Sequence, residues 1–333
     1  MEIHKIQMKL NGQMTQLPDS QKIFGCLMYL FSDQYGHEKG QMFVKAVKQK
    51  QITLMISDML PENYIPTPKN YLISRYQGDG KKEYYKQIKK LDFVSKCQWN
   101  LLSDISSIDS NVFNFDYISK VSSQQIRLGI KEDVYQLAGI GNDLYSVPKN
   151  EYVLIPHSSK SKEHKVITDY EFFVGIPCYE NIYADLVDKF LSCLYSLVEK
   201  KEIVVLGKRA SQGFNLFTFK SAITEKVNNH NSNHYLNLGM MIPEHIDYNN
   251  SVLQLYTSDR RPFEMVGSWD THIIEKDNHF LSFISSGSII ACTNKYKLND
   301  LTQSIEAKFD KNSIVFGNSF LYPLQSRGAL VYE

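Results

Sequence analysis

Several features that define common protein classes are missing from this sequence of 333 residues. Its five cysteines are scattered and none forms a C-x-x-C pair, which argues against a disulfide framework and against a structural zinc site. No apolar run approaches the roughly 20 residues that span a bilayer. The first residues also lack the apolar core of a secretory signal. We therefore expect a cytoplasmic protein that has no membrane partner.

The chain also has almost no net charge, because 37 lysines and arginines face 36 aspartates and glutamates. A globally basic nucleic-acid binder is excluded, so any contact with nucleic acid must be a local patch. Aromatic residues are frequent at 12%, with 21 tyrosines and 18 phenylalanines. They favour strands and also stack on bases. The length and the hydrophobic fraction of 43% allow two globular domains or one large one.

The most distinctive local pattern is a polar loop between two short apolar runs, residues 204–206 and 214–219, which is typical of a β-hairpin. A glycine at each side permits positive φ and lets backbone N–H groups approach a ligand. Two adjacent cations and several neutral donors suit a phosphate chain. The candidate RNA-binding residues are Gly207, Lys208, Arg209, Ala210, Ser211, Gln212, Gly213 and Asn215. The alternative is an ordinary solvated connection.

The N-terminal part of the chain predicts a strand over residues 3–10, a helix from Asp19 or Ser20 to about residue 35, and a strand over 51–57. Strand, helix and strand in this order form half of a ferredoxin-like unit. Asp19, Ser20 and Lys22 form a candidate anion site at the start of the helix. The simpler interpretation is that Asp19 and Ser20 only cap the helix.

Residues 78–96 contain six lysines with two tyrosines between them. The pattern matches a basic patch with interleaved aromatics. It also matches the solvated face of a helix over an apolar seam of Tyr85, Ile88 and Leu91. We favour the solvated face, because lysine faces of this kind are common.

A polar stretch over residues 158–165 marks a domain boundary. Beyond it, a strand over 166–174 and a helix over 181–200 repeat the first unit. One stripe of this helix is apolar, formed by Ile182, Leu186, Phe190, Leu194 and Leu197. We expect an α+β protein with two ferredoxin-like (RRM-like) domains, residues 1–157 and 158–333, the second of which carries the Gly-rich loop.

These motifs resemble those of the RAMP superfamily, the RNA-binding proteins of CRISPR effector complexes. Residues 207–213 resemble its Gly-rich loop, although Asn215 stands where the family often has glycine. Residues 19–25 resemble the turn that opens its first helix, and residues 64–69 resemble a proline-containing segment that follows the second strand. A thumb-like insertion over about 103–150 resembles the protrusion that kinks the guide RNA, with Gln125, Ile126, Arg127 and Leu128 at its centre. Alternatively, Arg127 pairs with Asp133 or Asp143 within the hairpin.

The resemblance is to the RAMP subunit of type III-A effector complexes that caps the 5′ handle of the crRNA. It implies a non-catalytic protein without a cofactor or metal, which binds the handle, docks on the large polymerase-like subunit and contacts the adjacent backbone RAMP subunit in antiviral defence. The alternative is a metal-independent RAMP endoribonuclease that processes CRISPR repeat RNA, which needs a histidine general acid or base. Its candidates are His4, His37, His230 and His234. A third possibility is an assembly protein without RNA contact.

The pair His230 and His234 also invites a metal interpretation, because the two residues are four apart. That spacing aligns two ligands only on a helix, and the intervening Asn-Ser-Asn is a poor helix former. No third ligand stands out nearby. We therefore expect a loop tip here and no metal.

Overall fold

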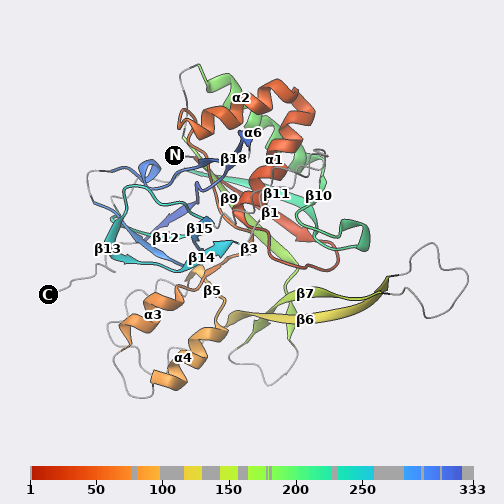
Figure 1. Cartoon of the computed structure of the whole chain (residues 1–333), viewed down its shortest axis with the longest axis vertical. Helices are drawn as coiled ribbons and strands as arrows, with labels where there is room; N and C mark the ends of the chain where they lie inside the picture. Colours follow the sequence, from red (N-terminus) through yellow and green to blue (C-terminus); the bar gives the residue numbers. More distant parts are fainter. Residues whose placement is uncertain are drawn as a thin grey trace, which may run out of the picture.

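The structure is a computed structural model, and it describes residues 2–76, 81–97, 116–129, 143–156, 164–177, 179, 182–226, 232–258, 281–293, 296–307 and 310–324. The chain folds into an α+β protein in which helices pack on antiparallel sheets (Figure 1). None of the helices in these residues is long and apolar enough to cross a bilayer.

The centre of the molecule is a six-stranded sheet built from both halves of the sequence. Its order is β10 (Ile203–Val205), β11 (Leu216–Lys226), β1 (Glu2–Leu10), β9 (Asp169–Ile176) and β2 (Met55–Ile56), and the short β3 (Leu60–Pro61) also pairs with β9. The first strand was predicted correctly. It pairs antiparallel with β11 on one side and with β9 on the other.

Helices α1 (Ser20–Tyr35) and α6 (Ala184–Glu199) each connect two strands of this sheet that are not neighbours. α1 leads from β1 to β2 across β9, and α6 leads from β9 to β10 and β11 across β1. Two interlocked split β-α-β units of this kind form one ferredoxin-like arrangement. A division at 157/158 does not follow this sheet, because it would separate β1 from both of its partner strands.

Three helices cover the sheet, with α2 (His37–Lys48) following α1 directly. Phe31 of α1, Phe43 of α2 and Phe190 of α6 meet in the core, with ring centroids 4.9 Å apart for Phe43 and Phe190. The predicted apolar stripe of the second helix is confirmed for Leu186, Phe190, Leu194 and Leu197. It is wrong for Ile182, which precedes the helix and is 86% exposed.

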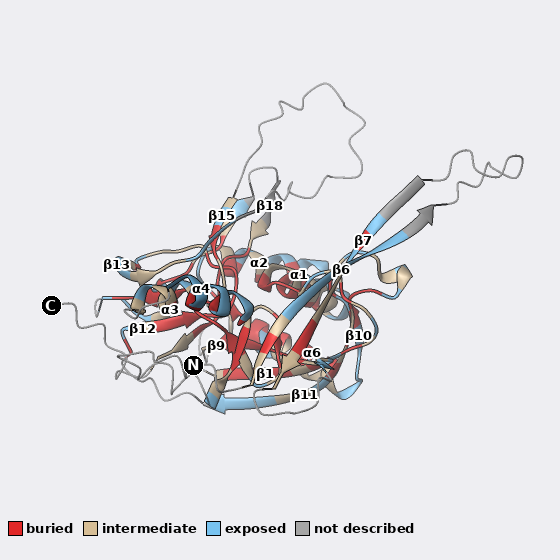
Figure 2. Ribbon diagram, turned by 90° about the horizontal axis from the view of Figure 1, so that it is seen from below, coloured by how far each residue is buried: buried red, intermediate tan, exposed pale blue. Residues whose placement is uncertain are grey.

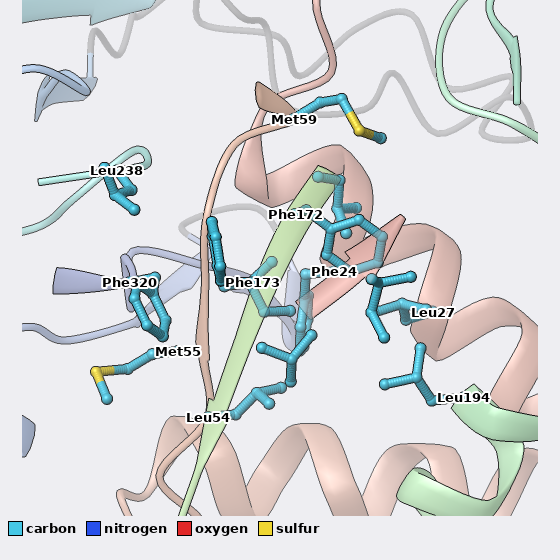
Figure 3. Close-up of a cluster of buried hydrophobic side chains, with 14 of the residues drawn as sticks. Phe24, Leu27, Leu54, Met55, Met59, Phe172, Phe173, Leu194, Leu238 and Phe320 are labelled. Carbon is cyan, nitrogen blue, oxygen red and sulfur yellow. The ribbon is translucent and has the colours of Figure 1, made fainter. Parts of the chain in front are cut away.

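Both faces of β9 are buried, and this explains why the strand lacks the alternation of a half-exposed strand. Figure 3 shows Phe172 beside Phe24 and Leu27 of α1, and Phe173 beside Phe320 from the C-terminal part. The rings of Phe173 and Phe320 have centroids 5.3 Å apart. The strand therefore joins the helical layer to the C-terminal sheets.

The C-terminal part forms a four-stranded sheet and two strand pairs. The sheet has the order β13 (Asp247–Val252), β16 (Ile289–Ala291), β12 (His234–Asn237), β19 (Leu321–Pro323). The pairs are β14 (Leu255–Ser258) with β15 (Leu281–Ile284) and β17 (Ile305–Ala307) with β18 (Asp310–Val315). Among the described residues from 232 onward the only helical element is the 3-10 turn η3 (Leu298–Asp300). The elements α6 and β9, which the sequence assigned to a second ferredoxin-like domain, belong to the central sheet.

A third sheet carries the predicted thumb-like insertion. Its order is β4 (Tyr64–Pro66), β5 (Phe93–Ser95), β6 (Tyr117–Gly129), β7 (Asp143–Ile155), β8 (Lys165–Val166), and helices α3 (Lys69–Arg75) and α4 (Lys81–Lys90) lie between β4 and β5. Figure 2 shows β6 and β7 extending away from the body as a two-stranded arm. Residues 103–115 and 130–142 of the insertion lie outside the described residues.

Candidate nucleic-acid interface

The Gly-rich loop connects β10 to β11 at the edge of the central sheet, and the predicted hairpin is confirmed. Residues 210–212 form a single 3-10 turn, η2 (Ala210–Gln212). Left-handed residues flank this turn, Arg209 with φ 70° and Gly213 with φ 78°. The N–H groups of Gln212 and Gly213 donate to Arg209 and Ala210 within the turn, at 3.0 and 2.9 Å. Gln212 and Gly213 therefore offer no backbone donor to a ligand, in contrast to the prediction.

Backbone donors remain on the side of the loop that precedes the turn. Among the described residues, no acceptor lies within hydrogen-bonding reach of the N–H groups of Gly207, Lys208, Ala210 and Ser211. Lys208 and Ser211 are exposed, and Nη1 of Arg209 donates to Oε1 of Gln212 at 3.4 Å. Several N–H groups next to cationic side chains form a site suited to a phosphate group.

Asn215 holds this loop together from inside. Its side chain is fully buried, and Nδ2 donates to the Lys208 carbonyl at 2.6 Å and to Oγ1 of Thr15 at 2.9 Å. Oδ1 accepts from the N–H of Thr15 at 2.9 Å. Its φ of 58° is left-handed, which asparagine tolerates better than most residues. Asn215 therefore has a structural role in the loop, and its contact with RNA stays a prediction.

Gly207 is required because the backbone passes close to this amide. A Cβ atom at Gly207 would lie 2.8 Å from Nδ2 of Asn215. Any side chain at position 207 would push Asn215 away from the Lys208 carbonyl. The two residues thus fix the loop jointly.

A short segment after β1 ties the Gly-rich loop to the arm. Asn215 donates its N–H to the Gln13 carbonyl at 2.8 Å, and Asn150 of β7 donates its N–H to the Met14 carbonyl at 2.8 Å. Nδ2 of Asn150 also donates to the Thr15 carbonyl at 2.5 Å. The loop and the base of the arm therefore share one strip of backbone, residues 13–15. We call the loop, this strip and the arm the loop–arm surface.

The four predicted thumb residues lie in β6 on the arm. Gln125 and Ile126 are exposed, Ile126 to 74%. Arg127 and Leu128 pair in register with Tyr145 and Leu144 of β7. An exposed isoleucine on a projecting hairpin is suited to contact with a base.

At the predicted anion site at the start of α1, the side chains already contact one another and their neighbours. Asp19 caps the helix by accepting from the N–H of Lys22 at 3.0 Å, and its other oxygen accepts from Nζ of Lys22 at 2.8 Å. Asp58 also accepts from the N–H of Ser20 at 2.8 Å, while Oγ of Ser20 accepts from the N–H of Met240 at 3.1 Å. Two carboxylates already occupy this helix end, so Asp19, Ser20 and Lys22 stabilise the fold.

Comparisons with known proteins identify the architecture. No family model matches the sequence, and no curated protein matches it. The structure, however, superposes on a chain of the "Csm3-Csm4 subcomplex in the type III-A CRISPR-Cas interference complex" with a TM-score of 0.56 and 15% identity, covering 98% of this chain and 100% of that chain. The chain has the fold of Csm4.

Two further crystal structures agree with this assignment. A Csm1-Csm4 cassette in complex with pppApA has a TM-score of 0.52 at 12% identity, and one in complex with AMPPNP has a TM-score of 0.52 at 13% identity. Each comparison covers 98% of both chains. The RAMP-like fold predicted from the sequence is therefore confirmed over nearly the whole chain.

In this Csm4 fold, the two described lysines that lie beside Glu171 of β9 are both paired with its carboxylate. Glu171 is buried there between two lysines, with its oxygens 2.9 Å from Nζ of Lys5 and 2.6 Å from Nζ of Lys96. RRM domains stack bases on exposed aromatics of the sheet. A buried cluster of paired charges is unsuited to stacking bases on the sheet. The loop–arm surface is therefore the better candidate for a nucleic-acid interface.

His4 of β1 is only 2% exposed, and Tyr195 and Thr224 lie beside its Nδ1, at 2.7 and 3.3 Å. The sequence had not indicated this contact with a tyrosine. Burial lowers the pKa of His4, which favours the neutral ring.

Of the other candidates, His37 and His234 form no hydrogen bond with His4 in the described structure. His37 is exposed at the start of α2, His234 begins β12 and is not at a loop tip, and His230 lies outside the described residues. Within the described ranges no group of three or more His, Cys, Asp or Glu side chains is arranged to hold a metal ion.

Proposed function

We propose that this protein is a crRNA-binding subunit of a type III-A CRISPR effector complex in the cytoplasm, and that it holds the 5′ handle of the guide RNA on the loop–arm surface without catalysing a reaction. The observation that carries the proposal is the Gly-rich loop on a Csm4 fold, where the N–H groups of Gly207, Lys208, Ala210 and Ser211 have no acceptor among the described residues and lie beside two cationic side chains.

The chemistry of the loop suits an RNA backbone. A phosphate oxygen accepts from backbone N–H groups that a rigid turn presents, and the exposed Lys208 supplies charge at the same place. Asn215 and Gly207 keep this arrangement fixed before RNA arrives, so less conformational entropy is lost on binding. Ser211 is placed to reach a ribose.

The arm extends the surface away from the body. Residues 13–15 connect the loop to Asn150 at the base of the arm, so a strand of RNA held at the loop would continue along β6. Ile126 would then contact a base whose stacking is interrupted.

The partners follow from the same comparison. The matched structures are assemblies of Csm4 with Csm1 and with Csm3. We propose that this chain likewise docks on a large polymerase-like subunit and on a backbone RAMP subunit. With a net charge of only +1, its hold on the guide would depend on local contacts and on these neighbours.

The endoribonuclease alternative has less support. A general acid or base must reach the 2′-hydroxyl that it activates. His4, the histidine beside a tyrosine, is buried under α6, and no described histidine belongs to the loop–arm surface.

Removing the two charges of the loop tests the proposal. We expect Lys208→Gln with Arg209→Asn to weaken binding of a labelled 5′-handle RNA by about tenfold, because two phosphate contacts lose their charge. Asparagine is chosen at position 209 because it tolerates the left-handed backbone there. The measurement is fluorescence anisotropy with the purified protein, together with the guide RNA content of the assembled complex.

The matched control is Lys45→Gln with Lys200→Gln, which removes the same charge from an exposed position within α2 and from one directly after α6. It should leave RNA binding unchanged. An unaltered RNA content in the complex that carries the loop variant would contradict the proposal.

A further inference from the structure

Helix α4 is strongly basic, whereas the chain as a whole is almost neutral. Its ten residues hold five lysines and one glutamate, a net charge of +4, whereas the whole protein carries +1. All five lysines are exposed. They are Lys81, Lys82, Lys86, Lys89 and Lys90.

Four of the five lysines lie on one side of the helix. The buried side is formed by Tyr84 and Ile88, which pack with Leu72 and Leu91 in a small cluster of their own. At about 100° per residue, Lys82, Lys86, Lys89 and Lys90 fall within roughly 100° of arc opposite that side. Lys82 and Lys89 are separated by about 10 Å along the axis. This spacing spans about two phosphates of an extended strand.

Tyr85 lies beside the lysines, in contrast to the apolar seam predicted from the sequence. It is 42% exposed, and Nζ of Lys89 lies 4.6 Å from the centroid of its ring. Tyr84 takes the buried position instead. The exposed surface of α4 therefore combines cations with an aromatic ring.

The part of the chain that the structure describes does not neutralise this charge. No described carboxylate forms an ion pair with any of the five lysines. Lys81 and Lys82 stand at the helix N-terminus, where the helix dipole disfavours cations. Lys82 and Lys86, like Lys86 and Lys90, are like charges one turn apart and repel each other. If this face only contacted solvent, acidic residues in the first turn or one turn from a lysine would stabilise the helix better than these lysines do.

Contacts at the end of α4 connect it to the arm. Nζ of Lys69 donates to the Lys89 carbonyl at 2.9 Å and to Oδ1 of Asp92 at 2.7 Å. Oδ2 of Asp92 accepts from the N–H of Lys120 in β6 at 2.6 Å. Residues 120–126 of β6 are exposed, and Figure 1 shows α4 beside the start of β6. The lysine face thus lies next to the base of the arm.

We propose that the lysine face of α4, with Tyr85, binds the phosphate backbone of a single-stranded nucleic acid independently of its sequence. Flexible lysines suit phosphates as point charges, and an exposed ring beside them stacks on any base. An acidic protein partner fits less well, because lysine is depleted in protein interfaces and Tyr85 is the only large apolar side chain that the described residues of α3 and α4 expose.

The full-length protein tests this with a labelled 20-nucleotide RNA that contains no handle sequence. We expect Lys82→Gln with Lys86→Gln and Lys89→Gln to weaken binding by about tenfold, and to reduce the slope of log affinity against log salt by about 2, since each lost phosphate contact contributes about 0.7. The same loss is expected for a DNA strand of equal sequence, because both strands share the phosphates. Tyr85→Ala alone should weaken binding several-fold, while Tyr85→Phe should not.

The control removes equal charge elsewhere, as Lys45→Gln with Lys200→Gln and Lys201→Gln, and should keep the wild-type slope. Glutamine is a good helix former, so α4 should remain folded, and the triple Lys→Arg variant at positions 82, 86 and 89 should bind like wild type. A wild-type protein that fails to bind the strand at low salt, or an α4 variant with an unchanged slope, would overturn the proposal. So would a variant that binds RNA normally but no longer joins a protein complex. The Gly-rich loop is intact in every one of these variants, so failure here leaves the handle proposal open to its own test.

Discussion

Replacing Asn215 with alanine is expected to lower the free energy of unfolding by about 3 kcal/mol, one of the two largest effects on stability that we predict for a single polar substitution here. The change removes three hydrogen bonds of a buried amide and leaves the Lys208 carbonyl and the Thr15 N–H without partners. It also forces alanine into a left-handed backbone at φ 58°. Urea denaturation monitored by circular dichroism measures the loss.

A matched control separates the hydrogen bonds from the backbone strain. Asn63 is exposed and has a similar φ of 65°, so Asn63→Ala carries the same backbone cost without the buried network. It should lose only about 1 kcal/mol. Equal losses for the two variants would show that the amide of Asn215 contributes nothing beyond its backbone conformation.

The second large effect concerns Asp58 and pH. Burial, and next the nearby Asp19 carboxylate, raise the pKa of Asp58 to about 7 from its ordinary value of 3.8, although the N–H of Ser20 and the charge of Lys22 act in the opposite direction. A raised pKa means that the folded protein holds this proton more tightly than the unfolded chain does. The contribution to stability is therefore complete below about pH 4, falls between pH 4 and 7, and is absent above that range.

Replacing Asp58 with asparagine should remove the loss of folding stability between pH 4 and 7. The amide oxygen of asparagine still accepts from the N–H of Ser20, but it carries no charge to bury. We expect Asp58→Asn to be more stable than wild type by about 1–3 kcal/mol at pH 8, and to show a flatter profile between pH 4 and 7. Thermal denaturation across this pH range measures both effects.

Asp169 provides a control, because its pKa is shifted in the opposite direction to that of Asp58. A hydrogen bond from Lys220, 2.7 Å away, lowers the pKa of Asp169, so its contribution to stability is present at neutral pH and is lost in acid. Asp169→Asn should therefore not become more stable at pH 8. A wild-type profile that rises steadily from pH 4 to 7, or an Asp58→Asn variant less stable than wild type at pH 8, would contradict the assignment to Asp58.

Both residues lie where segments far apart in the sequence meet. Asn215 holds the Gly-rich loop to residues 13–15, and the site of Asp58 holds the start of α1 to Met240 near the C-terminal sheet. Their importance for the fold is therefore invisible in a local pattern. The sequence gives no signal for the role of residues 13–15 beyond the turn at Asn11–Gly12 that precedes them. At this turn a Cβ atom on Gly12 would lie 2.8 Å from the carbonyl oxygen of Gly213.

Local features were determined by the sequence itself. The periodicity of Ile23, Phe24 and Leu27 predicted α1, Asp19 marked its cap, and the glycines at 207 and 213 marked the loop of a hairpin. Each of these depends on side chains a few residues apart, whose geometry the backbone period fixes. The lysine content of α4 was equally visible in the sequence, but the exposure of Tyr85 was not.

The tertiary structure alone decided which strands share a sheet and which polar side chains face solvent. β1 could pair with any strand of suitable pattern, and its selection of β9 and β11 merged two predicted domains into one sheet. The same packing buried Asn215 and Ser20, two of the predicted RNA contacts, and left the lysines of α4 without an ion pair to any carboxylate that the structure describes. Strand pairing and burial depend on contacts between residues far apart in the chain, and periodicity carries no information about those contacts.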